Sequence, residues 1–474
     1  MSRELNRSIG LRFAIIFVIA NIIGSGVYKK VAPMTAELNS GILVLLCWLA
    51  GGVITLFGAL SVAELAAMMP HSGGEFNYHK RIYNKFFAFT YGWASYTVIK
   101  TGTIASLAYV FAQSLHQVIN GPELWPSLAQ INLFNVFYPF QSLNVKLTAI
   151  ALILLLTLFN TMGIKIGVRL SATILGLVLA GIATIVIVGI TSPSASVSKI
   201  TDSGSSFTVS AFLTAMLSAF FAYEGWNGIA YVGGEVKDPQ KNIPLSLAIG
   251  VFAVIAIYLV VDATYLAVLS VDELTEIYHS QNKIAAVEAM RKVTGNAGAL
   301  AISILIVVTT FGCIHASIVS NSRIYFAMAK ERLFFSKAGR INSRNAPSFS
   351  LWMQGIWSSL LVMSGTFDQL TDMLIFAAFI FYGASALGVI VLRFTAPDEP
   401  RPYKVWGYPY VPAAFFLFSV GLVFNSIFTR PREAAIGLSL IASGVPFYFW
   451  FVRKREANGE SRMERRESRV ERQE

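Results

Sequence analysis

Long apolar runs separated by short polar segments dominate the hydrophobic pattern of this chain of 474 residues. A helix needs about 20 apolar residues to cross the roughly 30 Å hydrocarbon core of a bilayer, and twelve runs approach that length. They are centred near Ile22, Phe57, Ser106, Leu154, Ala180, Ala222, Ile255, Val308, Leu360, Tyr382, Ser419 and Ile441. The pattern predicts an all-α integral membrane protein with twelve transmembrane helices.

Composition agrees with that prediction and narrows the function. Hydrophobic residues make up 55% of the chain and charged residues only 13%, whereas a soluble protein needs about a quarter of its residues charged. The net charge of +11 could indicate a nucleic-acid partner, but the basic residues lie in short clusters between the apolar runs. We therefore exclude a soluble enzyme or binding module and expect the bilayer, not nucleic acid, as the surrounding partner.

The distribution of lysine and arginine predicts the orientation in the membrane. If the N-terminus is cytoplasmic, the inward segments before the tail hold eighteen basic residues and the outward segments nine, which favours cytoplasmic N- and C-termini. The N-terminal apolar stretch from Leu11 to about Ala32 is too long for a signal-peptide core, so we interpret it as an uncleaved first span. Residues 453–474 mix eight basic with six acidic residues and are predicted to be a disordered cytoplasmic tail.

Two of the apolar runs are interrupted near their centres. In the first, Gly24 and Gly26 flank Ser25, and in the sixth, the segment from Phe221 to Gly228 contains two glycines, an acid and an amide. Each glycine costs about 1 kcal/mol against alanine in a helix, and free backbone groups in hydrocarbon are tolerated only where they line a cavity or meet a ligand. Close helix packing is the alternative explanation for each glycine pair taken alone.

The positions of the two interruptions, first and sixth of twelve, are typical of inverted repeats with corresponding discontinuous helices. We predict a transporter domain over residues 1–452, with a first repeat at 1–191, a second at 207–395 and helices 11 and 12 at 408–452. In such a design, half-helix N-termini offer N–H groups to an anion and unwound carbonyls hold a cation. An α-amino acid carries both charges on one carbon and is the ligand that this chemistry favours.

Five segments in order carry a family resemblance. They are Ile22–Val27 (IIGSGV), Ala63–Tyr78 (AELAAMMPHSGGEFNY), Phe220–Pro244 (FFAYEGWNGIAYVGGEVKDPQKNIP), Phe311–Phe326 (FGCIHASIVSNSRIYF) and Arg401–Pro412 (RPYKVWGYPYVP). The chain resembles the amino acid, polyamine and organocation (APC) transporter superfamily, most closely its L-type amino acid transporter branch and the bacterial relatives of that branch. The resemblance implies a 5+5 inverted-repeat (LeuT-like) core with discontinuous helices 1 and 6, plus two peripheral helices.

The resemblance also implies roles for residues at the two breaks. Gly24, Ser25 and Gly26 match the segment that binds the substrate carboxylate, while Phe221 matches an aromatic lid and Asn227 a polar position at the distal wall. The carbonyls of Ile22, Phe221 and Glu224 match those that take the α-ammonium. The predicted substrate-binding residues are Ile22, Ile23, Gly24, Ser25, Gly26, Phe221, Tyr223, Glu224, Gly225 and Asn227.

Three departures from the family pattern bear on what drives transport. Val178 stands where many relatives carry a lysine, Lys100 where they often have glutamine or arginine, and His315 where they have asparagine. Lys100, His315 and Glu224 are the candidate coupling residues. The alternatives are a snorkelling lysine, a neutral packing histidine and a capped acid beside the break.

The sequence thus predicts a secondary active transporter of L-amino acids, with neutral side chains favoured, working by alternating access. Sodium-independent exchange and proton-coupled uptake both remain open, and a polyamine or cationic amino acid transporter is the alternative. A channel or a polytopic membrane enzyme is less favoured, because we find no ring of filter residues and no catalytic or metal motif; we expect no enzymatic activity, cofactor or metal.

A covalent partner is not expected. The outer loop from Gly121 to Lys146 contains no cysteine, whereas in animal relatives of this branch a cysteine in that loop joins a glycoprotein heavy chain. We therefore predict no disulfide-linked heavy chain and a multi-pass protein of a prokaryotic plasma (inner) membrane.

Overall fold

The structure is a computed structural model. It describes residues 7, 9–119, 124–125, 127, 131, 139–162, 168–201, 207–280, 283–344 and 346–454, with side chains of the fifth predicted span described from Thr173 onward. The predicted disordered tail lies outside the described residues from position 455 onward.

Helices account for the architecture of the described part of the chain. The first half contains α1 (Leu11–Ile22), α2 (Gly26–Lys29), α3 (Val31–Leu38), α4 (Gly41–Met68), α5 (Glu75–Ile82), α6 (Lys85–Ala94), the π-helical turn η1 (Ser95–Ile99), α7 (Lys100–Ile119), α8 (Leu143–Thr161), α9 (Val168–Ile190) and α10 (Ser198–Thr201). The second half contains α11 (Val209–Tyr223), α12 (Gly228–Tyr231), η3 (Gly233–Glu235), α13 (Pro239–Val268), α14 (Val271–His279), α15 (Ala285–Lys330), η4 (Ser336–Gly339), α16 (Ser348–Ser364), α17 (Phe367–Thr395), α18 (Tyr410–Thr429) and α19 (Pro431–Ala442). Every one of the twelve predicted span centres falls within a helix.

Nine helical segments of the described ranges are long and apolar enough to cross a membrane. The other three predicted spans correspond to α11, with 15 residues, α16, with 17, and α7, which opens on Lys100 after the π-helical turn. The chain is therefore a helical, multi-pass membrane protein, and the number twelve stays a prediction.

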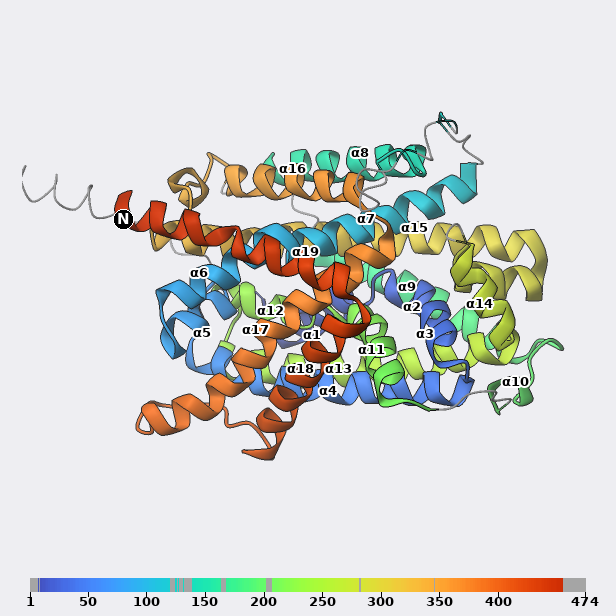
Figure 1. Cartoon of the computed structure of the whole chain (residues 1–474), viewed down its shortest axis with the longest axis horizontal. Coiled ribbons are helices and arrows are strands. Elements are labelled where there is room, and N and C mark those ends of the chain that lie inside the picture. The colour runs from blue at the N-terminus through green and yellow to red at the C-terminus, as the bar shows by residue number, and fades with distance from the viewer. Residues whose placement is uncertain are drawn as a thin grey trace, which may run out of the picture.

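Helices α4, α8, α15 and α16 run in roughly one direction, α17 and α18 cross them obliquely, and α1 and α11 lie within the bundle (Figure 1). Helix α4 packs along α13, α7 along α15 and α8 along α16. Helices α8 and α16 lie side by side at one edge of the bundle, at the top of Figure 1, and α4 lies at the opposite edge. Each of these pairs joins a helix of the first five predicted spans to its counterpart in the second five.

Packing and capping follow from the sequence. Large apolar side chains such as Phe252, Leu417 and Phe428 remain 66–70% exposed, as expected of a surface whose solvent is lipid. Polar residues close the helix ends instead: Thr208 caps α11 by accepting a hydrogen bond from the Ala211 amide. The residues of both predicted breaks, 21–28 and 221–228, are by contrast buried, with Gly225 partly exposed.

Candidate functional site

The two predicted breaks exist and lie against each other. Helix α1 ends at Ile22 before α2 begins at Gly26, and α11 ends at Tyr223 before α12 begins at Gly228. A Cβ atom on Gly26 would overlap the Cα of Ala222, and one on Gly225 would overlap the carbonyl oxygen of Asn21. Gly225 also has φ +106°, a conformation that favours glycine. Both glycines are therefore required for the close contact of the two breaks.

A tyrosine on a third helix ties the two breaks together. The hydroxyl of Tyr258, on α13, lies 3.1 Å from the carbonyl oxygen of Ile22 and 2.9 Å from that of Ala222, and donates between them. Two carbonyls freed by the helix ends thus share one donor at the centre of the bundle, where leaving them unpaired would be costly. Sequence reasoning missed Tyr258, because a single tyrosine inside an apolar run carries no motif.

The predicted carboxylate-binding segment is buried. The hydroxyl of Ser25 has no hydrogen-bond partner, so it is a donor held at the break without a protein acceptor. Gly24 faces Leu107 and Cys313, whose nearest atoms would lie 2.9 and 3.2 Å from a Cβ. Unlike Gly26, Gly24 meets only side chains, one of them the flexible end of a leucine.

The predicted side-chain pocket residues point in different directions. Ile23 lines a cavity described below, while the hydroxyl of Tyr223 donates to the Trp48 carbonyl at 3.1 Å and its ring packs edge-on against Trp48 on α4. Phe221 packs edge-on against Phe367 of α17, with 5.3 Å between ring centroids. The structure thus brings Phe221 to one end of the break and directs Tyr223 toward α4.

Lys100 is enclosed by acceptors at the sixth-span break. Its Nζ lies 2.7 Å from Glu224 Oε1, 3.0 Å from the Tyr382 hydroxyl and 3.3 Å from Asn227 Oδ1. The ring centroids of Tyr231 and Tyr382 lie 5.2 and 5.6 Å from the ammonium. We call these four residues, Glu224, Asn227, Tyr231 and Tyr382, the ammonium box. Lys100 is therefore a buried ion-pair partner and not a snorkelling side chain.

The ammonium box continues into a wider buried network. The amide of Asn227 donates to Glu75 Oε1 at 2.6 Å, and the Tyr382 hydroxyl donates to Glu224 at 2.9 Å. Lys100 itself follows the π-helical turn η1, a distortion that often marks functional positions. Asn227 thus links the break to α5, a connection that its predicted place at the distal wall does not include.

The other two departures from the family pattern share one cavity. Val178 and His315 both line a cavity of about 200 Å³ that includes Ile23 and is bounded by α1, α9 and α15. The Asn160 amide donates to Nδ1 of His315 at 3.2 Å and to the Leu156 carbonyl at 2.8 Å. In this orientation of the Asn160 amide, its N–H donates and Nδ1 of His315 accepts.

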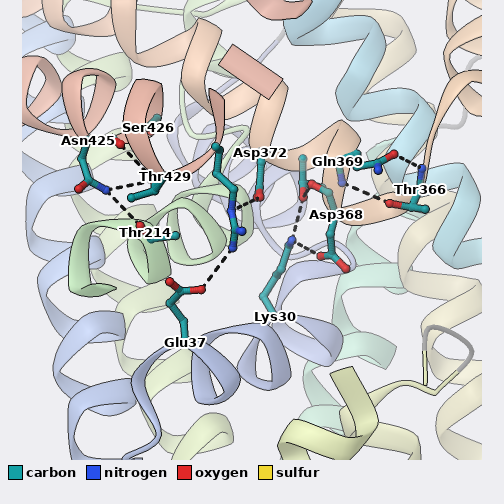
Figure 2. Close-up of polar contacts among 12 residues, drawn as sticks. Lys30, Glu37, Thr214, Thr366, Asp368, Gln369, Asp372, Asn425, Ser426 and Thr429 are labelled. Atoms are coloured by element: carbon teal, nitrogen blue, oxygen red, sulfur yellow. Dashed lines mark hydrogen bonds and ion pairs between the residues drawn. The ribbon is translucent and has the colours of Figure 1, made fainter. Parts of the chain in front are cut away.

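A cluster of ion pairs lies directly after α2, around Lys30 (Figure 2). Lys30 Nζ contacts Asp368 Oδ1 at 2.6 Å and the Thr371 hydroxyl at 2.8 Å, and it lies 5.4 Å from the ring centroid of Phe221. Arg430 bridges Glu37 and Asp372 at 3.3 and 3.4 Å. Beyond this cluster lies a cavity of about 520 Å³ lined by Lys29, Phe367, Asp368, Asp372, Arg430 and others.

Two acids near helix ends, Glu64 and Glu235, bind arginines from segments that are distant in the sequence. Glu64 receives two hydrogen bonds from Arg393, at 2.9 and 2.8 Å, and one from the Val405 amide at 2.7 Å. Glu235 pairs with Arg323 at 3.3 Å. Both contacts join segments far apart in the sequence, away from the ammonium box.

Two facing helix breaks at the centre of a helical membrane protein are typical of solute transporters. The profile of the family described as amino acid permease matches residues 9–452, so the chain belongs to the amino acid permease family, and its resemblance to the APC superfamily is confirmed.

Curated relatives match nearly the whole chain. It is 29% identical to the "Serine/threonine exchanger SteT" of Bacillus subtilis (strain 168), over 96% of this chain and 98% of that protein. It is 29% identical to human "b(0,+)-type amino acid transporter 1", over 95% and 88% of the two chains. It is 30% identical to mouse "Large neutral amino acids transporter small subunit 2", over 94% and 81%. The printed names of these three relatives all describe amino acid transporters or exchangers.

Proposed function

We propose that the protein is a secondary active transporter that moves neutral L-amino acids by alternating access, without sodium. The observation that carries the proposal is the contact between the two breaks, where an unpartnered Ser25 hydroxyl and the start of α2 lie against the end of α11. The carboxylate of a zwitterion would bind at Ser25 and the adjacent amides, and its ammonium at the freed carbonyls. The names of the relatives support an amino acid as the solute.

The pairing of helices supports the domain proposal. Helices α4, α7 and α8 pack against α13, α15 and α16, which is the pairing expected when residues 1–191 and 207–395 are inverted repeats. In this proposal α18 and the segment Pro431–Lys454 are the two peripheral spans. The excess of basic residues on one side then gives cytoplasmic termini.

Neutral selectivity rests on charge balance at the break. Glu224 would attract a cationic side chain, but Lys100 already pairs with it at 2.7 Å, and both side chains are at most 4% exposed. The Lys100–Glu224 pair itself therefore carries no net charge to offer a substrate side chain. Sodium independence is supported by the cavity that Val178 and His315 line. Its lining side chains are mostly apolar and none is a carboxylate.

Reconstitution tests the proposal directly. Purified protein in liposomes should accumulate radiolabelled neutral L-amino acids, equally in sodium and in choline buffer. Loading the liposomes with unlabelled amino acid would accelerate uptake if the protein exchanges, and an imposed pH gradient would do so if it is a proton symporter. Uptake of no amino acid under any of these conditions, by protein that is folded and monodisperse, would refute the proposed function.

A further inference from the structure

The ammonium box is a cation site that the protein fills with its own side chain. The three protons of an ammonium need three acceptors, and the Lys100 ammonium has them in Glu224, Tyr382 and Asn227. The ring of Tyr231, with its centroid 5.2 Å from the ammonium, adds an aromatic surface, which also attracts cations. Such a set of groups recognises an ammonium ion, whichever molecule carries it.

Two of the four box residues belong to the sixth-span break, at which the substrate is proposed to bind. Glu224 directly follows the last residue of α11, Tyr223, and precedes Gly225, whose positive φ makes the break. Asn227 is the residue before α12. Two of the four box residues are therefore part of the interrupted backbone itself, while Lys100 reaches them from a different helix, α7.

We infer that Lys100 is a specificity-determining residue: its tethered ammonium occupies the subsite that would otherwise bind the side-chain ammonium of a cationic amino acid. This inference rests on the proposed amino acid site at the breaks. With Lys100 in place, a substrate such as L-lysine would bring a second cation to a carboxylate that is already neutralised, and like charges in a buried site repel strongly. Without Lys100, the carboxylate of Glu224 is left unpaired and selects a cation from solution.

The distal carboxylate of an acidic amino acid is the rival occupant. In that case Lys100 would leave Glu224 and bind the substrate. The geometry favours the first reading, since Glu224 accepts both from Lys100 and from the Tyr382 hydroxyl, at 2.9 and 3.1 Å from its two oxygens. Moving Lys100 away would leave a buried acid without its cation, which is costly.

The test is competition between amino acids for the site of purified protein. A radiolabelled neutral L-amino acid that the parent transports serves as the probe, and L-lysine, L-ornithine, L-glutamate and an unlabelled neutral amino acid are the competitors. Lys100→Met should bind L-lysine at least about tenfold more tightly than the parent does, a change of about 1.4 kcal/mol. Adding Glu224→Gln to Lys100→Met should abolish that gain. Lys146→Met, which removes another buried lysine, is the matched control and should leave the ranking unchanged.

A second readout remains informative if Lys100→Met loses stability. Lys100→Ala leaves space for the missing chain, so n-butylamine or L-lysine should raise its thermal unfolding temperature and leave that of the parent unchanged. No gain in L-lysine binding and no rescue by either amine, in variants that still bind the neutral probe, would overturn the inference. Tight binding of L-glutamate to the parent, lost in Lys100→Met, would overturn it in favour of the rival. A parent that binds no amino acid would instead refute the proposed function.

Discussion

The ammonium box encloses Lys100, while Val178 and His315 line a separate cavity. All three residues depart from the family pattern, yet the two regions surround polar groups in opposite ways. In the box, Lys100 has three acceptors within 3.3 Å. In the cavity, most of the lining side chains are apolar, and Val178 offers no charge where relatives carry one. A charged side chain is stable at membrane depth only with partners of this kind. We therefore expect the Lys100–Glu224 pair in the box to stay charged during transport. Any proton that is taken up or released during transport is expected in the cavity.

The backbone at the box should tolerate less change than the backbone at the cavity. Gly225→Ala forces a side chain into a positive-φ position and onto the Asn21 carbonyl, so we expect transport to be lost and stability to fall by at least about 2 kcal/mol. Gly312→Ala, in the wall of the cavity, meets only the Ile174 side chain at 3.1 Å and should cost under about 1 kcal/mol. Uptake and thermal unfolding of the two variants check this pair, and near-equal losses would contradict the comparison.

The same substitution logic applies to Gly26. Gly26→Val should abolish substrate binding while the protein still inserts. A Cβ at this position would overlap the Ala222 backbone, so separation of α2 from α11 would cause the same loss as a blocked carboxylate site. Gly24→Ala changes the predicted carboxylate segment with a smaller clash, against the end of Leu107. Gly421→Ala, in open space on α18, is the control. Normal affinity of a monodisperse Gly24→Ala or Gly26→Val protein would remove the predicted carboxylate site.

Removing one charge of the buried pair should cost more than removing the histidine. Glu224→Gln leaves the Lys100 ammonium buried without its carboxylate, and we expect about 3 kcal/mol of lost stability. His315→Asn gives up one hydrogen bond from Asn160 and should cost about 1 kcal/mol or less. Thermal unfolding in detergent measures both. If Lys100→Met/Glu224→Gln is as unstable as the sum of its single variants, the two groups are not coupled.

The pH dependence of transport should separate the two regions. Lys100 and Glu224, two of the three candidate coupling residues, pair with each other, so the third, His315, is tested as the group that sets the pH dependence. We expect His315→Asn to change the profile of initial uptake rates between about pH 5 and 8, and Lys100→Gln to alter substrate ranking instead. Both should behave alike in sodium and in choline. Identical profiles for the parent and His315→Asn, or a strict sodium requirement, would show that coupling lies elsewhere.

An exposed lysine–glutamate pair, Lys292 and Glu273, serves as a reference for the buried Lys100–Glu224 pair. Breaking the exposed pair should have the smallest effect on stability. Lys292 contacts both oxygens of Glu273, at 2.5 and 2.7 Å, outside the predicted spans. Burial opposes ionisation of Glu273, but the bonds from Lys292 and Ser270 outweigh it and hold its pKa below the usual range.

The sign of the pH effect at this exposed pair follows from the depressed pKa. The stabilisation from Glu273 is present at neutral pH and is lost as the pH falls through the folded-state pKa. Glu273→Gln should cost less than about 1 kcal/mol at pH 7 and nothing at a pH low enough to protonate Glu273. A cost at pH 7 equal to that of Glu224→Gln would mean that burial adds nothing to the box.

Periodicity and glycine placement predicted much of this molecule. The twelve apolar runs all coincide with helices, and both breaks fall at the glycines that predicted them, because backbone strain and hydropathy are local properties. Contacts between distant segments were beyond reach: nothing near Lys100 in the sequence indicates Glu224 or Tyr382, and nothing near Tyr258 indicates the carbonyls of Ile22 and Ala222. The packing reason for Gly26 was likewise invisible, since it depends on α11 passing directly over it.

Protection of a single thiol at the break tests the amino acid site most directly. In a protein whose Cys47 and Cys313 are replaced by alanine, Ser25→Cys puts a thiol where the unpartnered hydroxyl now lies. Saturating neutral L-amino acid should slow its alkylation several-fold, while the methyl ester of the same amino acid, which lacks the carboxylate, should not. Equal alkylation rates with and without the amino acid, in protein that still transports it, would contradict a substrate site at the two breaks.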